Sequence, residues 1–152
     1  MSAPAPKGLG GLAGVQTYVN ANAFDNVDFA AHALSLAENV GASINYFVTT
    51  PAVALELATV KELASSQRPL LGADVNNGTS RSILGVPLLV SPYVAADTLW
   101  ALDSSRCWLI VREPARVEVD HSVLFTSDRV AVKATIRVGF VHPASVVRVS
   151  LA

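Results

Sequence analysis

Residues 130–140 read Val-Ala-Val-Lys-Ala-Thr-Ile-Arg-Val-Gly-Phe, and this stretch decides which kind of fold the chain can adopt. Apolar side chains occupy every even-numbered position, while the odd-numbered positions carry small or polar residues such as Lys133 and Arg137. Successive side chains of a strand point to opposite faces of a sheet, so a period of two residues predicts a strand. Held over this length, the period predicts a long, half-buried antiparallel strand over 129–141.

Shorter β-prone runs extend outward from this strand in both directions along the chain. We predict further strands over residues 44–49, 82–90, 98–102, 107–112, 116–120 and 145–151. Gly85 and Pro87 interrupt the second of these runs. The chain after residue 81 is therefore expected to be mostly β.

Two helices are predicted in the first half. Asp25 or Asn26 can cap the first, and Gly41 can end it in a left-handed C-cap. Its apolar residues recur at helical spacing: Phe29, Ala33, Leu36 and Val40. Thr50 can cap the second helix, with Pro51 at its first position. Its expected buried stripe is Val53, Leu57, Val60 and Ala64. These elements predict an α+β fold, with two helices packed on a mixed sheet followed by long antiparallel strands.

The composition excludes several classes of protein. Of 152 residues, 51% are hydrophobic and only 15% charged, which is too apolar for intrinsic disorder. A net charge of −1 argues against a strongly basic nucleic-acid binder. Apolar runs such as 83–90 are far shorter than the ~18 residues that a spanning helix needs. Self-association remains as the interpretation of the high hydrophobic content.

The termini, cysteine content and charge distribution refine this interpretation. The N-terminus shows no secretory signal pattern, and a single cysteine fits a reducing cytosol. Residues 1–80 hold three basic and six acidic residues, whereas residues 81–152 hold eight basic and six acidic ones. Seven of those eight basic residues are arginine. Arginine is favoured in ion pairs at interfaces, so these residues are expected either to form such pairs or to lie on the exposed faces of strands.

No pattern in the sequence indicates an active site, a metal site or a cofactor site. The histidines, His32, His121 and His142, lack the spacing of metal ligands. Cys107 begins an apolar strand and is expected to be a buried, inert thiol. No Gly-x-Ser-x-Gly motif is present, and the glycines of 8–14 lack a preceding strand and a following Gly-Lys-Ser/Thr. We therefore predict no catalytic, cofactor-binding or metal-binding residue.

The order of several segments resembles the C-terminal part of tailed-phage major capsid proteins with the HK97 fold. The segments are Lys7-Gly-Leu, Glu38-Asn-Val-Gly-Ala42, Tyr46-Phe-Val-Thr-Thr-Pro51, Leu70-Leu-Gly72, Ile83-Leu-Gly-Val-Pro-Leu-Leu-Val90, Arg116-Val-Glu-Val119, Phe125-Thr-Ser-Asp128, Val130-Ala-Val-Lys-Ala-Thr-Ile-Arg-Val138 and His142-Pro-Ala-Ser-Val146. The resemblance covers nearly the whole chain.

The resemblance implies a domain organisation. We expect a flexible, Gly/Pro-rich leading segment over 1–14, an A-domain-like lobe over 15–102 and a P-domain-like β region over 103–152. The family's N-terminal arm, E-loop and spine helix would lie upstream of Met1. The chain is therefore expected to be a truncated or degenerate prophage gene product, or a piece of a longer chain.

The resemblance also implies a function and a set of partners. It implies a non-enzymatic shell subunit that assembles with itself into pentameric and hexameric capsomers, in the bacterial cytoplasm and then in the virion. Neither sequence-specific nucleic acid nor membrane is expected as a partner. Some family members form a Lys–Asn isopeptide bond assisted by a Glu. Here the Asn position falls on Asp128 and the Glu position near Thr135, so no cross-link is expected.

Two alternatives remain open at the level of sequence. An encapsulin-type compartment shell shares the fold. A small α+β enzyme or ligand-binding domain could instead assemble a site from loops such as 68–81 and 121–129, although no nucleophile, acid–base pair, metal set or phosphate loop supports it.

Overall fold

The structure is a computed structural model that describes residues 8–11, 14–20, 24, 26–61, 69, 71, 81–122, 127, 129–141 and 146–151. Its elements, in chain order, are η1 (Leu9–Gly11), β1 (Gln16–Asn20), α1 (Asp28–Asn39), β2 (Tyr46–Thr49), α2 (Pro51–Thr59), β3 (Ser82–Ile83), β4 (Val86–Val90), β5 (Thr98–Leu102), η2 (Ser104–Arg106), β6 (Trp108–Asp120), β7 (Ala131–Val141) and β8 (Val146–Leu151). Six strands form one sheet in the order β1-β8-β5-β2-β4-β3, and β6 pairs with β7 in a second sheet. We call the six-stranded sheet with α1 and α2 the lobe, and β6 with β7 the ribbon.

The sheet of the lobe is mixed, as the sequence predicts. β1 runs parallel to β8 and β2 runs parallel to β4, whereas β5 is antiparallel to both β2 and β8. The expected division at residue 102 does not follow the sheets, because β8 lies inside the lobe between β1 and β5. Val146, Val147 and Val149 are fully buried there, and this burial draws the end of the chain back into the lobe.

Helix α1 forms largely as its sequence predicts. The predicted cap at Asn26 is displaced by one residue: Val27 occupies the N-cap and makes no side-chain capping bond. The Asn26 side chain lies just before it and accepts a hydrogen bond from the backbone N–H of Asp28 at 3.1 Å. Gly41 follows the helix with a φ of +69°, a left-handed conformation that glycine adopts without steric cost. Phe29 and Ala33 are buried. Val40 was predicted to belong to the same stripe, but it is exposed because the helix ends at residue 39 and turns there.

Helix α2 starts where the sequence predicts. The hydroxyl of Thr50 accepts a hydrogen bond from the N–H of Val53 at 3.3 Å, and Pro51 occupies the first turn. The helix ends at Thr59, so Val60 caps its C-terminus and is only half-buried. Ala64, the last residue of the predicted stripe, lies outside the described residues.

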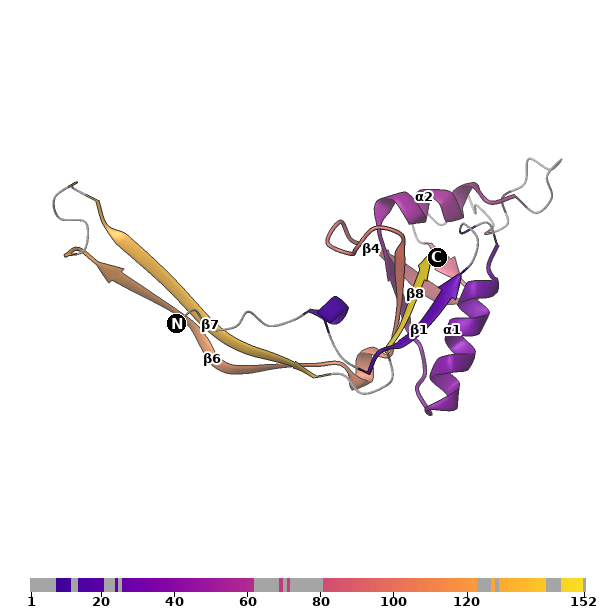
Figure 1. Ribbon diagram of the computed structural model, residues 1–152, viewed down its shortest axis with the longest axis horizontal. Coiled ribbons are helices and arrows are strands. Elements are labelled where there is room, and N and C mark those ends of the chain that lie inside the picture. Colours follow the sequence, from indigo (N-terminus) through magenta and orange to yellow (C-terminus); the bar gives the residue numbers. More distant parts are fainter. Residues whose placement is uncertain are drawn as a thin grey trace.

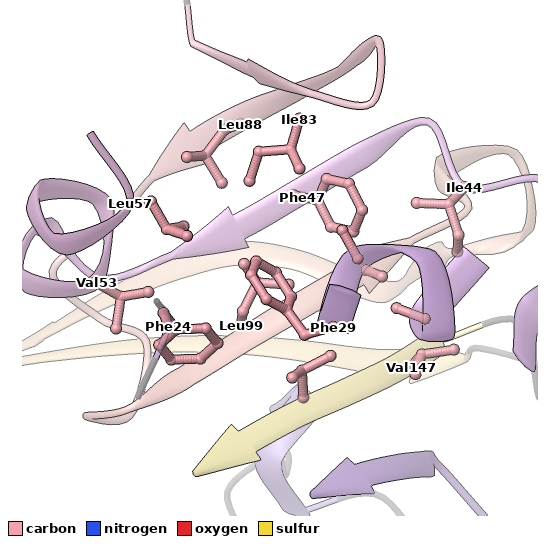
Figure 2. Packing of buried hydrophobic residues seen from close by; sticks show 14 of the residues in the cluster. Phe24, Phe29, Ile44, Phe47, Val53, Leu57, Ile83, Leu88, Leu99 and Val147 are labelled. Atoms are coloured by element: carbon pink, nitrogen blue, oxygen red, sulfur yellow. The ribbon is translucent and has the colours of Figure 1, made fainter. Parts of the chain in front are cut away.

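The hydrophobic core lies between the helices and one face of the six-stranded sheet. Figure 2 shows its labelled side chains, among them Phe29, Phe47 and Leu99, gathered between helix and strands. All three are fully buried, and each such side chain contributes roughly 1.5–3 kcal/mol relative to an exposed position. The lobe therefore has its own core and does not need the ribbon for it.

The ribbon projects away from the lobe as a long two-stranded arm (Figure 1). The predicted strands 107–112 and 116–120 are one strand, β6, and the predicted strand 129–141 is β7. The antiparallel pairing of the long strand is confirmed, but its predicted half-burial is wrong over most of its length, because β6 is exposed throughout and no element of the described chain covers the pair.

Candidate assembly surface

The register of the ribbon divides its side chains between two faces. Directly opposed residues of an antiparallel pair point to the same face. Val119 lies opposite Val132, and Val117 lies opposite Ala134. The alternate positions place Glu118 opposite Lys133 on the other face. The alternation that identified the strand therefore produces one apolar and one polar face.

The apolar face extends along the whole ribbon. Because β7 alternates regularly, its even-numbered residues and their partners on β6 share this face. Its members are Leu109, Val111, Val117, Val119, Val130, Val132, Ala134, Ile136, Val138 and Phe140. We call this set the apolar face. It contains no charged residue.

Much of the apolar face is open to solvent. Val132 is 66% exposed, Val117 and Leu109 are 64% exposed, and Ile136 is 56% exposed. Val111, Val119 and Val130 are also about half exposed, so exposed apolar side chains follow this face along the length of the ribbon. A row of exposed apolar side chains of this kind is typical of an interaction surface.

The polar face carries the ion pairs of the ribbon. Glu118 accepts from Arg116 Nε at 3.1 Å and lies 3.9 Å from Lys133 Nζ. Arg137 Nε lies 3.3 Å from Glu113 Oε2. All these side chains are well exposed, so each pair contributes at most about 1 kcal/mol. Arg116 and Arg137 therefore lie on an exposed strand face of the single chain, a position that fits both readings that the sequence left open.

The middle of β6 is irregular. The register shifts between Val111 and Glu113 and again between Glu113 and Arg116, a segment that contains Pro114. Extra residues on one strand bend it and increase its twist, and proline removes a ladder hydrogen bond. The gap at residues 113–115 between two predicted strands lies in this irregular segment of a single strand.

The base of the ribbon is apolar on both sides. Trp108 is 64% exposed and Ile110 is 54% exposed, and by alternation both lie on the face opposite Leu109 and Val111. The surface open to a partner therefore includes both faces near the lobe and one face toward the tip.

A polar cluster occupies the joint between the lobe and the ribbon. The Asp103 carboxylate is 3% exposed and accepts hydrogen bonds from the hydroxyl and backbone N–H of Ser105 and from the N–H of Ser43. The Ser105 hydroxyl bond is the main cause that lowers the pKa of Asp103; burial opposes it, and Ser43 and Arg106 add to the lowering. Burial, with the nearby Asp103 charge, raises the pKa of Cys107, which is half-buried rather than buried as predicted.

The other residues that the sequence singled out do not form a site among the described residues. Among the described residues, no group of three or more histidine, cysteine, aspartate or glutamate side chains could hold a metal ion. His32 is exposed and stacks on Tyr18 with ring centroids 4.7 Å apart. Thr135 lies on the polar face opposite Arg116, whereas Asp128 and His142 lie outside the described residues. Within the described part of the chain, no helix has the length and apolarity to cross a membrane.

The fold is shared with capsid structures. At 18% identity and a TM-score of 0.66, the chain matches the capsid of an empty GTA particle computed with C5 symmetry, covering 97% of this chain and 54% of that one. Mycobacterium phage Ogopogo matches at 17% identity and a TM-score of 0.63, over 90% and 54% of the two chains. A virus-like particle from Pyrococcus furiosus matches at 15% identity and a TM-score of 0.62, over 92% and 56%.

These similarities show an HK97-like fold, and the chain spans about half the length of the solved structures that it matches. No curated protein matches the sequence. The sequence does match the phage capsid family over residues 2–150, which is nearly its full length. The chain therefore belongs to the phage capsid family.

Proposed function

We propose that the chain is a region of a shell subunit that assembles with further copies into the pentameric and hexameric capsomers of a phage head. The family match over residues 2–150 is the observation that carries this proposal. The exposed apolar face supports it independently, because a monomeric protein in water rarely leaves so large an apolar surface uncovered. Assembly takes place in the host cytoplasm, and the product resides in the virion.

The lobe and the ribbon have separate tasks in this proposal. The lobe, with its own core, is the A-domain-like part that faces a symmetry axis. The ribbon is the P-domain-like part, and it supplies the apolar face to neighbouring polypeptide. In the ring contacts of a capsomer, one patch of a subunit meets a different patch of the next one.

The proposed role is structural and involves no catalysis. Sequence-specific nucleic acid and membrane are not partners in it, in keeping with a net charge of −1 and with ribbon cations that pair with Glu113 and Glu118. Thr135 stands near the position of the glutamate that assists cross-linking in some capsids. The proposal therefore includes no isopeptide bond, and a covalent ladder on a denaturing gel would contradict this part of it.

Negative-stain microscopy combined with a solution mass tests the proposal. Rings or shells, or a mass that rises in steps with concentration, are the expected result. A strict monomer at high concentration that gains thermal stability from a small molecule would instead favour a ligand-binding or enzymatic domain. The shell role would then be withdrawn, while the fold assignment would stand.

A further inference from the structure

The lobe and the ribbon are successive sections of one long hairpin. Leu102 at the end of β5 lies opposite Val146 of β8, and Trp108 at the start of β6 lies opposite Val141 of β7. Between these two pairs the outgoing chain passes through residues 103–107, which contain η2. The hairpin bends at this joint (Figure 1), so the joint decides where the ribbon points.

Side-chain packing against the lobe does not fix the direction of the ribbon. Every residue of β6 is exposed, and the described helices and strands of the lobe make no extensive packing contact with β6 or β7. Cys107, the residue just before β6, is only half-buried. Within the described residues, the polar contacts of the joint are therefore the side-chain contacts that connect the start of the ribbon to the lobe.

These contacts tie the joint to the segment between α1 and β2. The Asp103 carboxylate accepts from Ser43 N–H at 3.2 Å, and the Asn45 side chain accepts from Ser104 N–H at 2.9 Å. Arg106 donates to the carbonyl of Gly41. Segment 41–45 is itself fixed to the lobe, because Ala42 and Ile44 are buried in its core.

Asp103 is the centre of this cluster. One carboxylate oxygen accepts from Ser43 on the lobe side and lies 3.5 Å from Arg106 Nε on the ribbon side. The other oxygen accepts two bonds from Ser105, which shape η2. A single buried carboxylate thus joins the fixed segment to the residues that lead into β6, and charge-assisted bonds of this kind are stronger than neutral ones.

We propose that Asp103 is a positioning residue that sets the direction of the ribbon relative to the lobe. Its biological use rests on the proposed shell function, because the direction of the ribbon decides where the apolar face meets its neighbour. The proposal itself concerns a single chain and is tested on one. All residues of the cluster belong to the same copy, so its contacts do not require a second subunit.

Distances between spin labels, measured by double electron–electron resonance, test this proposal. One label is placed on α1 by Ser35→Cys and the other on the polar face of β7 by Thr135→Cys, both exposed sites, in a Cys107→Ser background. Labelled chain is diluted into unlabelled chain so that only distances within one copy contribute. We expect a single narrow distance distribution in the parent and a broadened, shifted one in Asp103→Ala.

A matched control separates the joint from carboxylate loss in general. Glu118→Gln removes a carboxylate with two ion pairs on the ribbon itself, and it is expected to leave the distribution unchanged. A label pair within the lobe, Ser35→Cys with Glu56→Cys, checks that the lobe remains folded. If Asp103→Ala disturbs that pair as well, Arg106→Gln decides the question, because it removes only the ion pair and the bond to Gly41.

The outcomes distinguish this proposal from the shell function. An unchanged distribution in Asp103→Ala, or in Arg106→Gln where that variant decides, overturns the positioning role, even if the parent forms shells. A narrow parental distribution that is lost in the variant supports the role, even if microscopy of the parent shows no assembly.

Discussion

The double substitution Val119→Thr with Val132→Thr tests whether the apolar face is the surface that other subunits cover. The two valines lie directly opposite each other across the ribbon, near its tip, and are 54% and 66% exposed. Threonine has the same shape as valine and a high β-propensity, and Thr–Thr pairs across an antiparallel ladder are favourable. The exchange therefore leaves the free ribbon intact and changes only what a partner would contact.

The expected loss of association free energy comes from the two added hydroxyl groups. Burying a hydroxyl without a partner costs about 1–3 kcal/mol in protein substitutions, so two cost about 2–6 kcal/mol for each covered ribbon. A cross-strand hydrogen bond between the two threonines brings the cost toward the lower end of that range. Since 1.4 kcal/mol is a tenfold change, we expect association to weaken at least about 30-fold.

Sedimentation velocity over a dilution series measures the effect, with negative-stain images of the same samples. Lys133→Gln is the matched control, because Lys133 neighbours Val132 on β7 but points to the polar face. We expect this control to associate like the parent. The circular dichroism of all three chains should match, which shows that strand content is retained.

Equal association of the parent and the double variant, with matching circular dichroism, would refute the reasoning. The apolar face would then remain in water throughout assembly, and the contacts between subunits would have to lie on the lobe or at the base of the ribbon.

Three further predictions concern the stability of the lobe and of the joint. Asp103→Asn should make the stability of the chain depend less on pH in the acid range. The pKa of Asp103 is lowered in the folded state, so the carboxylate's contribution to stability is complete above its unfolded pKa of about 3.9 and is lost as pH falls through the folded pKa. Melting temperatures from pH 7 to pH 2.5 measure this, and parallel curves for the parent and the variant would contradict it. Thr50→Ala removes the hydroxyl that caps α2 and should lower the free energy of unfolding by about 1 kcal/mol in urea titrations, whereas no change would mean that Pro51 alone sets the start of the helix. Leu84→Asn should raise the free energy of unfolding by about 0.5–1 kcal/mol in the same titrations. Leu84 has a φ of 51° in the turn between β3 and β4, and asparagine tolerates this left-handed conformation better than leucine. Leu84→Val should lower the free energy of unfolding.

Local sequence patterns predicted the elements with the clearest periods and caps. The alternation over 130–140 identified β7, and Thr50-Pro51 placed the start of α2. Gly41 was correctly placed in a left-handed cap. Each of these signals arises from a residue's own conformational preference or from its nearest neighbours, so no knowledge of the tertiary fold is needed.

Pairing between distant segments could not be predicted in this way. β1 was missed, because five residues beside a parallel partner carry no period that distinguishes them from a loop. β8 was predicted as a strand but grouped with the ribbon, since its buried valines give no indication of which sheet buries them. The joint at Asp103 was also missed, because its partners Ser43 and Asn45 lie about sixty residues earlier in the sequence.

The alternation of residues in β7 predicts an apolar face, but it does not indicate which polypeptide covers that face. A two-stranded ribbon is at best marginally stable in water without a third layer, and its exposed ion pairs add little. The lobe has its own core, whereas β6 is exposed throughout, so the ribbon is the part that gains most stability from contact with a partner. The low charged fraction of 15% agrees with this placement, because many of the exposed large apolar side chains lie on the ribbon. In the two proposals made above, the contacts of Asp103 set the direction of the ribbon, and a neighbouring polypeptide covers its apolar face.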